Sequence, residues 1–280
     1  MFDQLKNRYC LSGRLVSDGA LHVGSGAPGE EVDMPVMRDR AGRALIPGSS
    51  LRGALRSLLE RTLAMAAPGR SCTLFHADEE EPCPTANRTQ AERIRKLVEE
   101  GKAAAARAIL FADGDSPGRL CATCRLFGSP FAASKLKVLD LAAKAGEPAV
   151  SIRHSVGIDR DEGRARDGIL YDYEVLEKGR EAAVFAMEIT GENLNVGNPD
   201  FGLLGVLWTM ASRGLTVGAK SGSGMGNCRL VLDKVLFFDE ARAHKLRDFL
   251  LAKSGEEYAV MKPAEFLGLI EGEKKQFLGA

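Results

Sequence analysis

The sequence lacks the features that mark several classes of protein. It has no run of roughly eighteen apolar residues, so no segment is long enough to cross a membrane as a helix. Its first residues, MFDQLKNRYC, hold no apolar core of the kind that signal peptides have, and we expect a cytoplasmic protein. Neither charge is in excess, because 38 Lys and Arg balance 38 Asp and Glu. This balance is weak evidence against a free-standing nucleic-acid-binding protein but leaves room for a local basic groove.

Two nucleotide-binding signatures and internal repeats are also absent. The glycine-rich stretch VGAKSGSGMG (217–226) fits neither the P-loop pattern nor the dinucleotide-binding pattern. No repeat with a period of roughly 20–50 residues is evident. With 45% hydrophobic and 27% charged residues, the chain has the composition of a globular protein with one large domain or two small ones.

The order of apolar patterns along the chain predicts an α+β fold. Residues 9–24 alternate between apolar and polar and end in glycines, which indicates a strand that runs into a loop. Residues 35–46 have the pattern of a short hairpin, and an amphipathic helix with Leu51, Leu55, Leu58 and Leu59 on one side follows. Later strands flank a strongly apolar helix at 200–213. This order suits a ferredoxin-like (RRM-like) core with insertions.

Two regions depart from this core pattern. Residues 67–125 are rich in Pro, Cys and acidic residues and contain a polar helix at 88–111, which indicates an insertion. Residues 241–280 are helical in pattern and charged, and we expect them to form a peripheral tail. The chain is thus expected to be a single domain over 1–280, whose core comprises 8–66 and 126–240.

The entrance of the first helix has the residue types of an anion site. In the stretch IPGSSLRGALR, Ser49 or Ser50 can cap the helix, and the free N–H groups of the first turn attract phosphate. Arg52 and Arg56 lie one turn apart and would flank such an anion. The alternative is a capped surface helix with solvated arginines.

The glycine loop offers a second site of the same kind. Four glycines within 217–226 leave the backbone accessible, and Lys220 adds a cation, as in loops that cradle phosphate. A flexible turn is the alternative. Two such elements in one β-rich domain favour an extended backbone ligand over a mononucleotide.

The cysteines predict a zinc site. Cys10 and Cys228 fall in expected strands, where they are small buried residues, and the other four fall in the insertion: Cys72, Cys83, Cys121 and Cys124. The last two form a Cys-x-x-Cys knuckle, and four such ligands suit structural, tetrahedral zinc. His76 could replace Cys72. A thioredoxin-like redox motif is disfavoured because no βαβ pattern follows.

Several of these segments occur in a familiar order. LHVGSG, VDMPVMRD, LIPGSSLRGALR, CRLFGS, VGIDRDEGRARDGILYDYE and GAKSGSGMGNCRL follow one another as in the RAMP superfamily. Over residues 8–236 the chain most resembles the backbone subunit of type III CRISPR effector complexes, which polymerises along the guide RNA. Such subunits often carry a zinc-bound insertion, and CATCRLFGS is similar to theirs.

The resemblance implies RNA contacts. The helix entrance and the glycine loop would hold the guide backbone, and residues 150–180 would form a thumb hairpin that parts a base pair of the guide–target duplex. Ile158 would be the wedge, with Arg164 among the arginines that touch phosphates. A solvent-exposed hairpin is the alternative. The expected RNA-binding residues are His22, Ser49, Ser50, Arg52, Arg56, Arg153, Ile158, Arg160, Lys220, Ser221, Gly222, Ser223, Gly224 and Met225.

Asp33 is the expected catalytic residue. By composition alone it is one of several loop acids, and a solvated side chain would be its ordinary role. By resemblance it matches the aspartate on which target-RNA cleavage depends, together with Mg²⁺ or Mn²⁺. A carboxylate can hold such an ion or assist attack by a 2′-hydroxyl on the adjacent phosphate.

The sequence therefore predicts a guide-RNA-binding subunit that also cuts target RNA. Its expected partners are the guide CRISPR RNA, target RNA, copies of itself and other type III subunits, without a membrane. One alternative is a non-catalytic scaffold in which Asp33 is inert. Another is a guide-RNA-processing endonuclease of the same superfamily, although most of those use an N-terminal histidine and lack the zinc insertion.

Overall fold

The computed structural model describes most of the chain. The described residues are 4–72, 80–111, 118–143, 148–177, 183–194, 199–242, 244–252 and 259–279. The fold is α+β with antiparallel sheets, as predicted. Across the described ranges, no helix combines the length and the apolar composition needed to cross a membrane.

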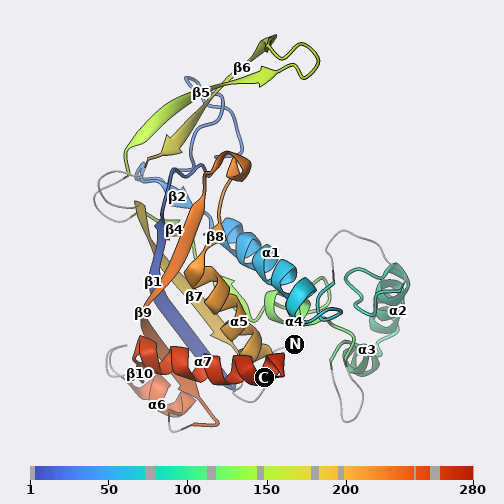
Figure 1. The fold of residues 1–280 in the computed structure, drawn as a ribbon. Coiled ribbons are helices and arrows are strands. Elements are labelled where there is room, and N and C mark those ends of the chain that lie inside the picture. Colours follow the sequence, from blue (N-terminus) through green and yellow to red (C-terminus); the bar gives the residue numbers. More distant parts are fainter. Residues whose placement is uncertain are drawn as a thin grey trace.

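A long antiparallel sheet forms the centre of the molecule (Figure 1). Its middle strand is β1 (Asn7–Ser17), whose side chains alternate between buried and half-buried along most of its length. β1 pairs on one side with β7 (Ala183–Glu192) and on the other with β9 (Asn227–Asp239). Short strands complete the sheet: β3 (Leu136–Val138) on β7, and β8 (Leu215–Thr216) and β10 (Val260–Met261) on β9. The resulting order is β10-β9-β1-β7-β3.

Two helices pack on one face of this sheet. α1 (Gly48–Ala66) lies between β1 and β3 in the chain, and α5 (Pro199–Arg213) lies between β7 and β9. The leucines of α1 are buried with the inward side chains of the strands. α5 is apolar nearly all round because it is covered by the sheet, by α1 and by the C-terminal helix. These contacts form the main core.

The C-terminal segment is not peripheral, and that prediction is wrong. It forms α6 (Leu246–Leu251), then β10 at the sheet edge, then α7 (Pro263–Leu278), which lies across α5 (Figure 1). Phe266 is fully buried, and its ring meets those of Tyr9 and Phe201. Most charged residues of α7 lie on its outer face, whereas the half-buried Lys274 donates to the Thr209 hydroxyl of α5 at 3.2 Å.

The cysteine-rich insertion has a small core of its own. It contains α2 (Arg88–Glu99), α3 (Ala103–Leu110) and α4 (Ala122–Phe127), and α2 and α3 project to one side of the sheet (Figure 1). The single helix expected at 88–111 is instead two helices. The chain turns at Gly101, whose φ of 73° favours glycine, so α3 packs back on α2.

The hairpin expected at 150–180 is confirmed over its described part. β5 (Val150–Ile158) pairs antiparallel with β6 (Ala165–Leu176), and the pair extends away from the sheet (Figure 1). The hairpin expected at 35–46 is reduced to one bridge, Arg38 to Ala44, around a turn in which Gly42 N–H donates to the Asp39 carbonyl. Its second arm, β2 (Leu45–Ile46), pairs with β4 (Leu141–Ala142) instead.

Candidate functional site

Four cysteines from separate parts of the insertion meet at one point. Cys72 follows α1, Cys83 precedes α2, and Cys121 and Cys124 begin α4. Their sulfur atoms all lie within 4.8 Å of one another. Within the described residues, this is the only group of three or more His, Cys, Asp or Glu side chains close enough to hold a metal ion. His76 lies outside the described residues.

The geometry of this cluster fits tetrahedral zinc. Zinc–sulfur bonds of about 2.3 Å place the sulfurs of a tetrahedral site about 3.8 Å apart. Here Cys72 Sγ lies 3.5 Å from Cys121 Sγ and 3.6 Å from Cys124 Sγ. Hydrogen bonds with Cys121 lower the pKa of Cys83 and Cys124 and raise the pKa of Cys72, and the hydrogen bond with Cys124 raises the pKa of Cys121. Four protein ligands leave no open position, so a bound ion would be structural.

Arg56 belongs to this cluster and is not placed to contact RNA. Its side chain is buried, and it donates to the Glu60 carboxylate at 2.9 Å, the Gly128 carbonyl at 3.0 Å and Cys124 Sγ at 3.3 Å. Burial alone would lower the pKa of Arg56, but the hydrogen bond to Glu60 and the charge of Cys124 raise it overall. The prediction that Arg56 flanks a phosphate is therefore corrected, because all sides of its guanidinium are engaged.

The helix entrance also differs from the prediction. α1 begins at Gly48 after Pro47, and no side chain caps it, so neither Ser49 nor Ser50 is an N-cap residue. The Asp140 carboxylate accepts from the Gly48 N–H at 2.7 Å instead. Ser49 is exposed, Ser50 is half-buried, and the half-buried Arg52 donates to the Phe127 carbonyl. Because the Gly48 N–H is already bound to Asp140, an anion at this entrance would contact the exposed Ser49 rather than a first turn whose N–H groups are all free.

The glycine loop lies against the base of the hairpin. Lys220 Nζ donates to the Tyr171 hydroxyl at 2.7 Å and lies 4.2 Å and 4.9 Å from the ring centroids of Tyr171 and Tyr173. The hydrogen bond from Lys220 is the main reason that the pKa of Tyr171 is lowered. Met225 is buried against Tyr173, whereas the turn at 221–224 is exposed. A Cβ at Gly218 would lie 2.2 Å from the His22 carbonyl, so this loop needs glycine to sit so closely.

His22 supports the same junction from inside. It is buried, its Nδ1 lies 2.6 Å from the Glu174 carbonyl, and its ring meets Tyr173 edge-on. A nucleic acid would therefore reach its neighbours before it reached the imidazole. Glu174 in turn accepts from the Val36 N–H through Oε2, which ties the loop before β2 to the hairpin.

Asp33 lies at the outer edge of β6. Its carboxylate is exposed, and Oδ2 accepts the Asp172 N–H at 3.0 Å. The next residue, Met34, exchanges backbone hydrogen bonds with Asp172 and Glu174, so this part of the loop runs like a third strand beside β6. The loop acid expected from the sequence is thus held by a backbone N–H and remains exposed to solvent.

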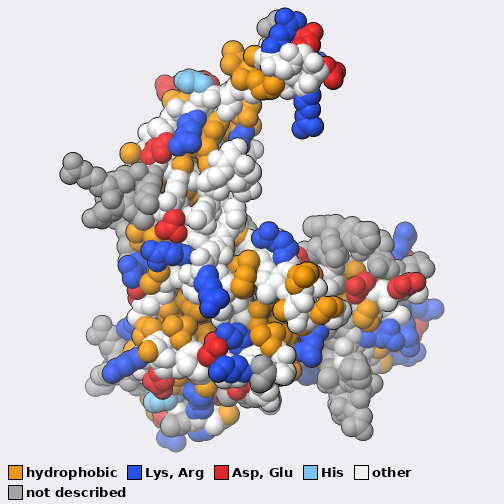
Figure 2. Space-filling model, in the orientation of Figure 1, with side chains coloured by type: hydrophobic (Ala, Val, Ile, Leu, Met, Phe, Trp, Pro, Cys, Tyr) orange, Lys and Arg blue, Asp and Glu red, His pale blue; other side chains and the backbone are white. Residues whose placement is uncertain are grey.

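The hairpin carries charged and apolar side chains toward its tip (Figure 2). Ile158 is 58% exposed near the turn, where Arg160 is also exposed. Arg153 pairs with Glu177 at 2.9 Å, and Arg164 pairs with Glu162 at 2.5 Å. The arginines on this arm are therefore partly neutralised by the hairpin's own carboxylates.

The structure thus brings part of the predicted set together. Asp33, His22, Lys220 and Met225 meet around the hairpin base, whereas the cysteines and Arg56 form a separate centre. The residues that join the first group were missed: Tyr171, Asp172, Tyr173 and Glu174. The sequence YDYE could have indicated them. In a strand, its alternation places the two aromatic side chains on one face and the two acidic side chains on the other.

Comparison with known proteins identifies a family. The model of the RAMP superfamily matches residues 15–229. The chain belongs to the RAMP superfamily. The matched range runs from β1 into β9 and includes α1, the insertion and the hairpin.

A curated relative extends the comparison over a shorter stretch. The chain is 43% identical over 60 residues to the CRISPR system Cms endoribonuclease Csm3 of Methanocaldococcus jannaschii. The match covers 20% of this RAMP chain and about a quarter (24%) of the length of that relative. It supports a link to type III CRISPR complexes.

Proposed function

We propose that this RAMP protein is a guide-RNA-binding backbone subunit of a type III CRISPR effector complex and that it also cleaves target RNA. Family membership and the likeness to an endoribonuclease of a CRISPR system support this proposal. Its partners would be guide RNA, target RNA, further copies of the chain and other subunits of the complex. Such a complex would work in the cytoplasm.

The topology supports a ferredoxin-like core for this subunit. The strands β9-β1-β7-β3 lie in that order, α1 connects β1 to β3, and α5 connects β7 to β9, which gives a βαββαβ path. We assign the core to 8–66 and 126–240, the insertion to 67–125 and the thumb to 150–180. Residues 241–280 complete the single domain through α7.

The proposed RNA path runs over the hairpin base and the helix entrance. The exposed turn 221–224 and Lys220 would face the guide backbone, together with Ser49 and Arg52 at the start of α1. Arg153 and Arg160 would contact phosphates along the thumb, and Ile158 would part a base pair. The buried His22 and Met225 would pack beneath the residues that contact RNA. Arg56 is not among the proposed RNA-binding residues.

Asp33 carries the proposal of cleavage. One carboxylate oxygen is anchored by a backbone N–H, and the residue as a whole is exposed to solvent. Mg²⁺ in nucleic-acid sites is commonly held by one or two carboxylates together with substrate phosphate and water, and a single exposed aspartate fits that manner of binding. When bound, Mg²⁺ or Mn²⁺ would stabilise charge on the phosphate. The other possible role of Asp33, in place of holding the ion, would be to accept the proton of the attacking 2′-hydroxyl.

The cysteine cluster would have a separate, structural role. Zinc held by Cys72, Cys83, Cys121 and Cys124 would join the end of α1 to α4 and to the start of α2. The absence of an open ligand position argues that this ion takes no part in cleavage.

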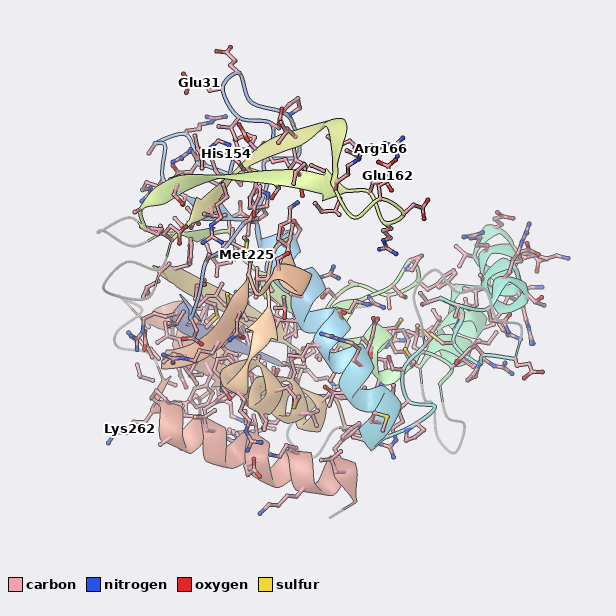
Figure 3. The ribbon with its side chains drawn as sticks, turned by 45° about the horizontal axis from the view of Figure 1, so that its top comes forward. Glu31, His154, Glu162, Arg166, Met225 and Lys262 are labelled. Atoms are coloured by element: carbon pink, nitrogen blue, oxygen red, sulfur yellow. The ribbon has the colours of Figure 1, made fainter. Side chains whose placement is uncertain are left out.

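The test is cleavage of labelled target RNA by the complex assembled with matching guide, with and without Mg²⁺ or Mn²⁺. Asp33→Ala should abolish cutting and keep target affinity. Glu31→Ala is the matched control, because this acid lies in the same loop (Figure 3) and should leave cutting intact.

Two results would contradict the proposal. Unchanged cutting by Asp33→Ala would remove the catalytic assignment. Tight target binding without cuts in the wild-type complex would mean a scaffold subunit, with cleavage left to a partner.

A further inference from the structure

Lys220 differs from the hairpin's own cations because no carboxylate neutralises it. Arg153 and Arg164 each pair with a glutamate of the hairpin, at 2.9 Å and 2.5 Å. In the described part of the chain Lys220 forms no ion pair, and its ammonium lies against Tyr171 and Tyr173 instead. The charge of Lys220 therefore remains available to an anion.

Three contacts fix the place of this ammonium. Lys220 Nζ donates to the Tyr171 hydroxyl at 2.7 Å, and it lies 4.2 Å and 4.9 Å from the ring centroids of Tyr171 and Tyr173. Both distances are within the range of about 6 Å over which an aromatic ring attracts a cation. A lysine side chain loses much rotamer freedom when it is held. Here that freedom is lost on folding, before any ligand binds.

Tyr171 is itself held by the hairpin. It is the cross-strand partner of Ser155 on β5, and hydrogen bonds from Lys220 and, to a lesser degree, Ser155 lower the pKa of Tyr171. Its ring lies 6.1 Å from that of Tyr173, which is buried against Met225. Met225, at the end of the glycine loop, lies below the hairpin in Figure 3. Strand pairing thus places the Tyr171 hydroxyl beside the loop.

The backbone of Lys220 is in a conformation that residues other than glycine rarely adopt. Its φ is 61° and its ψ is 27°, and among the described non-glycine residues only Asn193 also has a positive φ. Glycine would adopt this conformation without strain. Such strain persists where the surroundings impose it, and it is common at ligand sites. A lysine at this position indicates that its side chain is used.

The turn after Lys220 adds further donors. Ser221–Ser223 form one turn of 3₁₀ helix directly after the left-handed Lys220, and successive N–H groups in such a turn form a concavity that binds anions. In the described part of the chain, the N–H groups of Ser221 and Gly222 have no acceptor. Both residues are exposed. An oxyanion such as phosphate suits an ammonium and neighbouring free N–H groups.

We propose that Tyr171 is a positioning residue for RNA binding, which holds the Lys220 ammonium ready for a phosphate of the guide backbone. This inference rests on the proposed function, in which Lys220 faces the guide and Tyr171 has no role. An ammonium has three N–H donors, and Tyr171 takes one, so two remain for phosphate oxygens. Because the phenol is neutral, it fixes the cation without cancelling its charge.

The test measures binding of a short single-stranded RNA to the purified full chain by fluorescence anisotropy, over a range of salt concentrations. Tyr171→Phe removes the hydroxyl and keeps the ring. It should weaken binding roughly 2–10-fold, because the lysine must then be immobilised when RNA binds. Lys220→Met should weaken binding more and lower the salt slope by about 0.7, the value for one phosphate contact on a single strand.

Tyr173→Phe is the matched control. The ring of Tyr173 also lies near Lys220, but its hydroxyl has no hydrogen-bond partner among the described residues. This variant should therefore bind RNA like the wild type. A loss as large as that of Tyr171→Phe would overturn the inference, because removal of any hydroxyl at the hairpin base would then have the same effect.

The double variant separates positioning from a structural role. In the Lys220→Met background, Tyr171→Phe should cause no further loss, because the side chain that Tyr171 holds is gone. An equal loss in both backgrounds would overturn the inference, since Tyr171 would then act through the fold of the hairpin. Wild-type affinity in Tyr171→Phe, with weak binding in Lys220→Met, would overturn only the inference. If the wild-type chain binds no RNA at low salt, the proposed function fails and the inference fails with it.

Discussion

The contact between Arg56 and the cysteine cluster gives a prediction that is independent of RNA. Four thiolates around Zn²⁺ carry a net charge of −2, and the Arg56 guanidinium donates to one of them, Cys124, at 3.3 Å. The site is buried, so solvent does little to replace this donor. Arg56→Gln should therefore weaken zinc binding while all four ligands remain.

The size of the effect follows from the kind of bond that is lost. A hydrogen bond to a charged group contributes about 1.5–3 kcal/mol. At about 1.4 kcal/mol per factor of ten, this predicts a loss of roughly 10–100-fold in affinity. The same range is typical when a partner of a metal ligand is removed.

The assay is competition for zinc between the purified protein and a chromophoric chelator, followed by cobalt substitution to read the sulfur ligands. Arg56→Lys should retain part of the affinity, because it keeps the charge and loses the planar donors. Glu60→Gln is the matched control, since Glu60 binds Nε of the same guanidinium whereas Nη2 donates to the sulfur. Equal zinc affinity in wild type and a folded Arg56→Gln would refute the reasoning.

Three further predictions follow from the core, the glycine loop and the buried thiol. Phe266→Ala should lower the free energy of unfolding by about 3–5 kcal/mol in chemical denaturation, because the ring is fully buried; a change below 1 kcal/mol would mean that α7 is peripheral after all. Lys220→Gln should raise the pKa of Tyr171 toward its ordinary value, as seen by absorbance titration, and should reduce the salt dependence of guide binding. An unchanged titration would contradict the contact. Burial raises the pKa of Cys228 to about 11, so at pH 8 this thiol should resist alkylation until the protein unfolds, and rapid labelling of the folded chain would contradict its burial.

The sequence predicts the central elements well because their signals are local. β1 alternates along its length, and α5 is apolar enough to need cover on several sides. The four cysteines were also predictable, since a Cys-x-x-Cys knuckle with two further thiols in the same insertion is typical of a zinc site. In these cases, residue type and spacing are enough to predict the element or the site.

Arg56 and the C-terminal segment were misread for a shared physical reason. One turn after Arg52, Arg56 has the spacing of a surface residue, but Cys124 of α4 and Gly128 at the end of that helix cover its side chain. Residues 241–280 have a charged pattern, yet the apolar stripe of α7 meets Tyr9 of the first strand. Burial in both cases is decided by segments far away in the chain, and no local pattern reports it.

The candidate site shows the same limit most sharply. Resemblance pointed to Asp33, but its surroundings depend on strand register: the Asp172 N–H anchors Asp33, and only the pairing of residue 154 with residue 172 places an imidazole against the Asp172 carboxylate. A slip of one residue would move His154 to the other face of the hairpin and separate it from Asp172. The bulge between Val156 and Ile158 lies on the tip side of this pair, so the pair keeps the register set at the hairpin base by Val150 and Leu176. Insertion of one residue between 150 and 154 should therefore break the contact between His154 and Asp172 while leaving Asp33 and its anchoring N–H in place.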